Sequence, residues 1–170
     1  MAGPLSTSWP DGGNLLIVGA GDSPTPSLED YVILDRIRGP VPAKCVRYRA
    51  KATPPARFDT FLVPYKGTAA PAVSAVELVS DEPGGKAASA FEVTTAQGKD
   101  IVFTSAEPGR KIAFAGGRLI TDAQAAALRF DRDGKLVYVF QFGGTETSCG
   151  GKSAITVKPG EAFAEWTMTN

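Results

Sequence analysis

Residues 128–145, LRFDRDGKLVYVFQFGGT, decide the fold. Apolar and polar residues alternate up to Asp131, and the alternation resumes after Lys135. Period-two spacing on both sides of an Asp-Gly turn is the strongest short-range sign of a β-hairpin, because Gly134 accepts the positive φ that the turn requires. After the turn, the large apolar side chains are expected together on one core-facing side of the hairpin: Leu136, Tyr138, Phe140 and Phe142.

The rest of the composition supports the same fold class. A chain of 170 residues fits one domain and buries roughly 70% of the surface that its unfolded form exposes. Its 19 glycines and 13 prolines are spread along the sequence, which is typical of short strands joined by turns. We expect an all-β antiparallel β-sandwich, jelly-roll-like or meander, with little or no helix. It is expected to be a single domain over residues 1–170, with a flexible or loop-like N-terminus over residues 1–13.

Alternation and turn residues place the individual strands. The N-terminal half is expected to hold a loop over residues 22–29 and strands over residues 14–18, 31–37, 45–52 and 58–65. The last of these strands is apolar on both faces, which predicts cover on each side, while Pro64 belongs near a strand end or an edge. A meander is expected from Val73. Segment 122–128 is compatible with one or two helical turns, although its second half shares the alternation of the hairpin. A final hairpin is expected around residues 158–161.

Charge and hydropathy exclude several classes of partner. Eighteen basic and eighteen acidic residues give zero net charge, so no global field attracts nucleic acid or anionic lipid. No apolar run approaches the ~18 residues of a membrane span, and the first 13 residues lack the basic and apolar regions of a signal peptide. We expect a soluble protein with no nucleic-acid and no membrane partner.

The absence of histidine removes the side chain most used for proton transfer and for zinc or iron ligation. Catalytic triads that need histidine are impossible, and no phosphate-binding loop or nucleophile elbow occurs. We therefore expect no catalytic residues, no metal and no other cofactor. The alternative is an enzyme with a glycosidase pair of carboxylates such as Asp59 and Glu77, since such a pair needs only proximity in space. Cys45 and Cys149 lack the spacing of a zinc cluster or redox pair, and they form either two free thiols or one long-range disulfide.

One charged pattern is a candidate binding surface. Arg47, Arg49 and Lys51 alternate along an expected strand, which places three cations on one face about 7 Å apart. Such a row would suit the successive carboxylates or sulfates of an acidic polysaccharide. The alternative is a solvated face whose cations pair with Asp or Glu on neighbouring strands.

Aromatic side chains are the second candidate surface, since the apolar face of a sugar ring stacks on a flat aromatic ring. Trp9 lies beside a Pro-Asp-Gly-Gly turn and Trp166 lies in the last expected strand; Tyr65 and Tyr31 are weaker candidates. The alternative for both tryptophans is a place in the core, or packing on each other where the terminal strands meet.

Several of these segments together resemble a known family. Four of them carry the resemblance: FDTFLVPYKG at 58–67, AVELVS at 75–80, FEVTTAQGKDIVFTSAEPGRKIAFAG at 91–116 and the hairpin LRFDRDGKLVYVFQFGGT. In this order they resemble the C-terminal β-sandwich of heparinase II/III-like polysaccharide lyases.

The resemblance implies only part of that family's function. Such lyases cleave uronate-containing polysaccharides by β-elimination, with catalytic groups supplied by an α/α toroid and by a histidine of the sheet domain. Neither a toroid nor a histidine is present here, so no catalytic position is carried over. The resemblance implies an accessory sandwich, extracellular or periplasmic, whose partners are an acidic polysaccharide and a catalytic α/α-toroid domain. The other hypothesis is a structural domain that docks on a catalytic partner without binding glycan.

Overall fold

The computed structural model describes residues 5–7, 12–20, 26–37, 39–49, 59–82 and 87–168. Every strand pairing among them is antiparallel, and no helix occurs in this part of the chain. The chain divides into two compact units, Met1–Pro71 and Ala72–Asn170, and each unit is described by itself. The expectation of a single domain over residues 1–170 stays a prediction.

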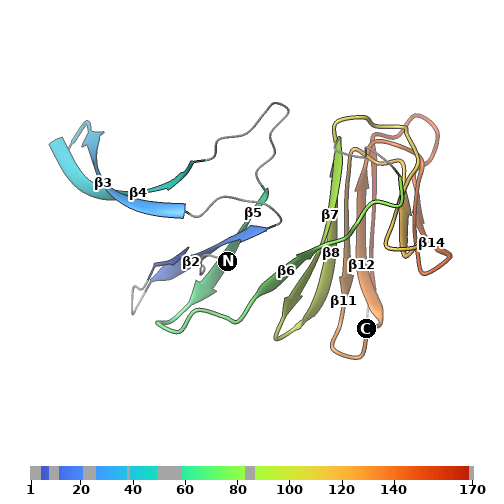
Figure 1. Ribbon diagram of the computed structural model, residues 1–170, viewed down its shortest axis with the longest axis horizontal. Helices are drawn as coiled ribbons and strands as arrows, with labels where there is room; N and C mark the ends of the chain where they lie inside the picture. The colour runs from blue at the N-terminus through green and yellow to red at the C-terminus, as the bar shows by residue number, and fades with distance from the viewer. Residues whose placement is uncertain are drawn as a thin grey trace. The chain divides into compact units, whose positions relative to one another are not determined.

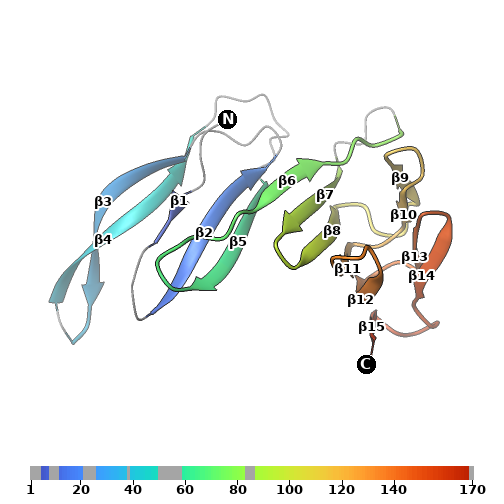
Figure 2. The same ribbon diagram turned by 90° about the horizontal axis from the view of Figure 1, so that it is seen from below.

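A three-stranded sheet forms in the first unit. It consists of β1 (Leu5–Ser6), β2 (Gly13–Ala20) and β5 (Asp59–Lys66) in the order β1-β2-β5 (Figures 1 and 2). Leu5 and Ser6 pair with β2, although a loop was expected over residues 1–13. Cover on both faces of β5 was also expected, and this is wrong: Leu62 is 62% exposed. Pro64 is tolerated because β5 is the outermost strand of this sheet.

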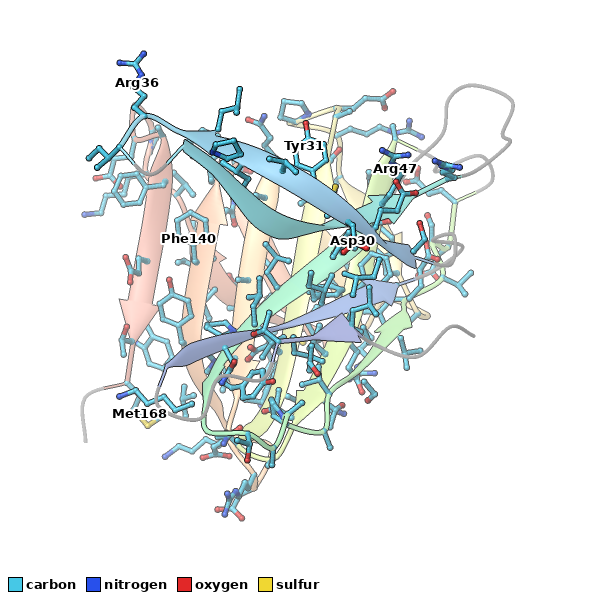
Figure 3. All side chains as sticks on the ribbon, turned by 90° about the vertical axis from the view of Figure 1, so that its left-hand side faces the viewer. Asp30, Tyr31, Arg36, Arg47, Phe140 and Met168 are labelled. Atoms are coloured by element: carbon cyan, nitrogen blue, oxygen red, sulfur yellow. The ribbon has the colours of Figure 1, made fainter. Side chains whose placement is uncertain are left out.

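The first unit also contains a two-stranded ribbon, β3 (Pro26–Asp35) and β4 (Gly39–Tyr48), paired over ten positions. The loop expected over 22–29 is therefore wrong from Pro26 onward. Tyr31 and Arg47 project from the ribbon and Arg36 from its turn (Figure 3). A two-stranded ribbon cannot bury both of its faces by itself. Six large apolar side chains on the ribbon and its turn are accordingly exposed: Leu28, Tyr31, Val32, Ile33, Leu34 and Ile37.

The second unit is a sandwich of two sheets, which confirms the predicted all-β antiparallel fold. The larger sheet has the order β15-β12-β11-β8-β7-β6, formed by β6 (Ser74–Glu77), β7 (Ala88–Thr95), β8 (Gly98–Ser105), β11 (Ala125–Phe130), β12 (Leu136–Phe142) and β15 (Phe163–Thr167). The smaller has the order β14-β13-β10-β9, formed by β9 (Ile112–Phe114), β10 (Leu119–Thr121), β13 (Glu146–Cys149) and β14 (Lys152–Thr156) (Figure 2).

The core of the second unit lies between these two sheets. Phe103 of β8 and Phe114 of β9 meet edge to face, with ring centroids 5.7 Å apart and an interplanar angle of 72°, a favoured geometry for aromatic pairs. The register places Ile101, Leu128 and Val139 in one cross-strand row on this inner face, and all three are at most 1% exposed.

The central hairpin forms as predicted and Leu136 packs against the core, but from Tyr138 onward the opposite face of β12 points inward. β11 and β12 pair around the turn at Asp131–Lys135, and Gly134 has a φ of 79°. A register shift between Arg129 and Phe130 marks a β-bulge. Because a bulge inserts an extra residue, it changes the side of the sheet to which the following positions point. Val139 and Gln141 are consequently fully buried, whereas Phe142 is 41% exposed.

The end of the chain also departs from the expected hairpin. β14 pairs with β13 in the smaller sheet, and β15 pairs with β12 in the larger one. The turn around Lys158–Glu161 therefore connects the two sheets instead of two paired strands. By contrast, segment 122–128 enters a strand at Ala125, in agreement with the alternation of its second half.

The Gly-Gly-Thr sequence after β12 holds the carboxylate of Asp122. Asp122 accepts hydrogen bonds from the backbone N–H of Thr145 (2.8 Å), the hydroxyl of Thr145 (2.6 Å) and the backbone N–H of Glu146 (2.9 Å). Burial raises the pKa of Asp122, but these hydrogen bonds outweigh it and leave the pKa below its ordinary value. A Cβ on Gly144 would lie closer than 3.0 Å to Asp122, so the contact requires glycine.

We predict that Gly144→Ala lowers the free energy of unfolding by about 3 kcal/mol, since it adds a steric clash to an unfavourable positive φ. Gly134→Ala is the matched control: its φ of 79° is similar to the 71° of Gly144, but no atom lies within 4 Å of the added Cβ. This control should lose only about 1 kcal/mol. Urea unfolding of both variants measures the difference, and equal losses would contradict the steric role of Asp122.

Candidate functional site

The cation row predicted from the sequence is neutralised in part by one carboxylate. Glu29 of β3 lies opposite Cys45 of β4. Its two oxygens contact Arg47 at 2.8 Å and Arg49 at 3.2 Å. The two arginines therefore pair with a neighbouring strand, as the alternative interpretation of the row expected, and they keep one net positive charge between them. Both pairs are exposed, so each contributes little to stability.

Three other binding residues predicted from the sequence are not seen beside Arg47 and Arg49. Lys51 and Trp9 lie outside the described residues. Tyr65 lies on β5 and donates its hydroxyl to the backbone carbonyl of Thr7, so it fixes the segment beside β2. Within the first unit, the described candidates thus lie on two separate sheets, Arg47 on the ribbon and Tyr65 on the three-stranded sheet.

Trp166 is the sequence candidate that lines a cavity. It lies on β15, the outermost described strand of the larger sheet, and is 44% exposed. A groove of about 660 Å³ runs along this strand. We name it the edge groove, and the residues that characterise it are Ile155, Lys158, Glu161, Phe163 and Trp166. It offers an aromatic surface, one cation and two carboxylates, those of Glu161 and Glu165.

A second cavity, of about 610 Å³, opens at the end of the sandwich where several turns meet. We name it the turn cleft, and the residues that characterise it are Lys99, Arg118, Phe130, Arg132, Asp133 and Cys149. Lys99 and Phe130 are paired neighbours on β8 and β11 of the larger sheet. Cys149 ends β13 of the smaller sheet. The cleft thus lies between the two sheets, where their cores stop.

Glu92 joins two of the cleft cations. Its carboxylate contacts Lys99 at 2.8 Å through one oxygen and Arg118 through the other. The Glu92 side chain is 17% exposed, against 39% for Lys99 and 41% for Arg118. Burial raises the pKa of Glu92, but the hydrogen bonds and charges of Lys99 and Arg118 outweigh it, and the net pKa is lowered. Glu92 is therefore ionised at neutral pH.

The hairpin turn forms the other wall of the cleft. The Asp131 carboxylate accepts hydrogen bonds from the backbone N–H groups of Asp133 (3.0 Å) and Lys135 (2.9 Å), as in an Asx turn. Nε of Arg132 donates to the carbonyl of Ala96 at 2.8 Å, which joins this turn to the turn between β7 and β8. The cleft therefore has an ordered wall that carries a cation.

Cys149 contributes a half-buried thiol to the cleft. Burial raises the pKa of Cys149, and the positive charge of Arg118 offsets only part of this effect. The thiol is therefore protonated at neutral pH, which makes it a poor nucleophile. Cys45 and Cys149 are both free thiols.

The described residues contain no cluster of three or more His, Cys, Asp or Glu side chains that could hold a metal ion. They also contain no helix of the length and hydropathy needed to cross a membrane. Comparisons with protein-family models, with curated proteins and with solved structures return no match.

Sequence reasoning missed the turn cleft because its cations are far apart in the chain. Lys99 follows the first turn of the meander, and Arg118 lies between β9 and β10. Only strand register and sheet packing bring them to the same carboxylate. A usable signal was the position of Glu92, an acidic residue between the apolar Phe91 and Val93 of an expected strand, since a carboxylate placed toward a core needs cationic partners.

We predict that Glu92→Gln lowers the free energy of unfolding at pH 7 by about 1 kcal/mol, since it removes a partly buried charge that two cations share. A lowered folded pKa stabilises the fold above the unfolded value of about 4.3, and this contribution is lost as the pH falls through the folded value. The difference in the free energy of unfolding between wild type and variant should therefore shrink from about pH 5 to about pH 3.

Urea unfolding at several pH values measures this difference, with Glu107→Gln as the matched control. Glu107 pairs with Arg110 in an exposed ion pair, so its substitution should alter the pH dependence far less. A difference between wild type and Glu92→Gln that stays constant with pH would contradict the prediction.

Proposed function

We propose that this chain is a non-catalytic accessory β-sandwich that contacts a uronate-containing polysaccharide through the edge groove. The observation that carries the proposal is the half-exposed ring of Trp166 in a groove that also holds Lys158. The resemblance to the sandwich of heparinase II/III-like lyases supports the choice of substrate class. It also supports a catalytic α/α-toroid domain as the partner.

Each part of the groove suits one part of a uronate. The Trp166 ring offers an apolar surface for the face of a sugar ring. Lys158 supplies a charge-assisted hydrogen bond for the carboxylate, and Glu161 accepts hydrogen bonds from hydroxyl groups. Because β15 is the outermost described strand of its sheet, the groove is open along its length and suits a chain better than a single buried ligand.

The Arg47 face is the weaker choice for this polysaccharide. Glu29 contacts both Arg47 and Arg49, so a bound carboxylate would have to compete with an internal one. An exposed ion pair is weak, so a carboxylate of the polysaccharide can replace Glu29 at these arginines. Such exchange attracts any acidic chain, but it gives little recognition of a particular sugar.

We predict that Trp166→Ala weakens the retardation of the protein about fivefold in affinity electrophoresis through gels that contain pectate, alginate or heparin, since a stacked ring contributes about 1 kcal/mol to sugar contact. Lys158→Gln should weaken the retardation by pectate and leave any retardation by a neutral glucan unchanged.

Phe142→Ala is the matched control. Phe142 is a half-exposed aromatic residue of the neighbouring strand, it lies on the face opposite to Trp166, and it does not line the edge groove. This variant should migrate like wild type. Wild-type protein that is not retarded in any of the three gels would refute the proposal.

A second function, docking on a catalytic partner without glycan binding, is favoured by a separate observation. The ribbon of β3 and β4 exposes large apolar side chains along its length; Leu34 is 80% exposed and Ile37 is 93% exposed. A concentration of exposed apolar side chains on one element is typical of protein interaction sites.

For this second function we predict that the isolated chain associates with increasing concentration in sedimentation velocity, since it has no partner to cover the ribbon. Leu34→Ser combined with Ile37→Ser should reduce this association without lowering stability, because both positions are exposed. Val79→Ser is the control, since Val79 is 76% exposed in the second unit. A monomer at all concentrations would contradict docking through the ribbon.

A further inference from the structure

The turn cleft has the composition of an anion site, and the polysaccharide proposal does not use it. Lys99 and Arg118 both contact the carboxylate of Glu92, so their positions suit the binding of a carboxylate. A lysine ammonium has three N–H donors and an arginine guanidinium has five. Each cation uses one donor on Glu92, so further donors remain for a second carboxylate.

A third cation lies on the opposite wall of the cleft. Nε of Arg132 is engaged with the carbonyl of Ala96, which fixes the guanidinium near the cleft and leaves its terminal nitrogens as donors. A planar guanidinium suits a carboxylate, since it can donate two parallel hydrogen bonds. Cations are therefore available on two sides of one open cleft.

The wall between the cations is apolar. Half-buried Phe130 supplies this wall; Ile101 also borders the cleft but is fully buried and adds no accessible surface. A volume of about 610 Å³ lies in the range of pockets that enclose small organic ligands. An apolar wall favours an anion that carries an apolar body over a fully hydrated inorganic ion.

The rim of the cleft selects against highly charged ligands. Asp131 and Asp133 both line it, and the carboxylate of Asp131 is already engaged within the turn. Like charges at the rim repel a chain of closely spaced anions. From these features we propose that the turn cleft binds a small organic monocarboxylate with an apolar body, held by Arg118, Lys99 and Arg132 against Phe130.

This site makes Glu92 a competitor of its ligand. The Glu92 carboxylate occupies donors that would otherwise face the cleft, and its charge opposes that of the incoming carboxylate. Replacement by glutamine removes the charge and keeps the shape. Affinity should therefore rise in Glu92→Gln, whereas a merely structural role of Glu92 would leave affinity unchanged or lower it.

The test uses the full chain and benzoate as the probe, followed by backbone amide NMR shifts and by calorimetry. Benzoate should shift the amides of Gly98 and Gly150, which line the cleft, with saturation. Benzyl alcohol, its neutral counterpart, should not. Arg118→Gln should weaken benzoate binding about tenfold, the effect of losing one charge-assisted hydrogen bond. Glu92→Gln should tighten it by a similar factor.

Two controls separate this site from other effects. Arg110→Gln removes an exposed arginine that pairs with Glu82 and Glu107 outside the cleft, and it should bind benzoate like wild type. Trp166→Ala should also bind benzoate like wild type, so failure of the edge groove and failure of the turn cleft are distinguishable.

Four results would overturn the proposal. They are an absence of saturable benzoate shifts, equal shifts with benzyl alcohol, the same shifts with sulfate alone, and tighter binding of heparin than of benzoate at the same amides. Unchanged or weaker benzoate affinity in Glu92→Gln would overturn the competition by Glu92.

Discussion

The second unit depends on the burial of one face of its six-stranded sheet against the four-stranded sheet. Phe103 and Phe114 meet across this interface, and the row of Ile101, Leu128 and Val139 lies in the same layer. Burial of apolar area at about 25 cal/mol per Å² is the main favourable contribution to such a fold. Because side chains alternate along a strand, the neighbours of each residue buried in this layer point to the other face of the sheet. The choice of buried residues therefore determines the positions of the cleft, the groove and the outward aromatic residues.

The fold was predictable where local pattern and tertiary packing agree. Alternation around Gly134 identified the hairpin, and turn residues identified most strands of the meander. The inward face of β12 beyond Leu136 was not predictable, because the extra residue Val137, opposite Arg129 and Phe130, leaves no mark in the apolar pattern. The alternation alone predicts Tyr138 and Phe140 as core residues. The strand from Pro26 to Glu29 was missed for a similar reason: prolines indicate a loop, yet a ribbon of two strands tolerates them, since each strand has a free edge.

The candidate sites were predictable only in part. Trp166 could be chosen from its residue type and its place near the end of the chain. The pairing of Arg47 and Arg49 with Glu29 could be expected as one alternative, since strands of opposite charge are often neighbours. The turn cleft could not be expected, because Lys99 and Cys149 lie on strands of different sheets and Arg118 lies between β9 and β10. Their convergence on one volume depends on long-range register, which a single sequence does not encode in any local pattern.

The connection from β14 to β15 has a consequence for truncation of the chain. β15 crosses from the smaller sheet to complete the larger one, and it pairs with β12 from Phe142 to Tyr138. A chain that ended at Thr156 would keep most of the inner layer but would leave the backbone N–H and C=O groups of β12 without this partner. Uncovered strand edges beside apolar side chains are templates for strand addition between molecules. The last described strand, β15, contributes no residue to the buried core cluster, and its role in this sheet is to cover the edge of β12.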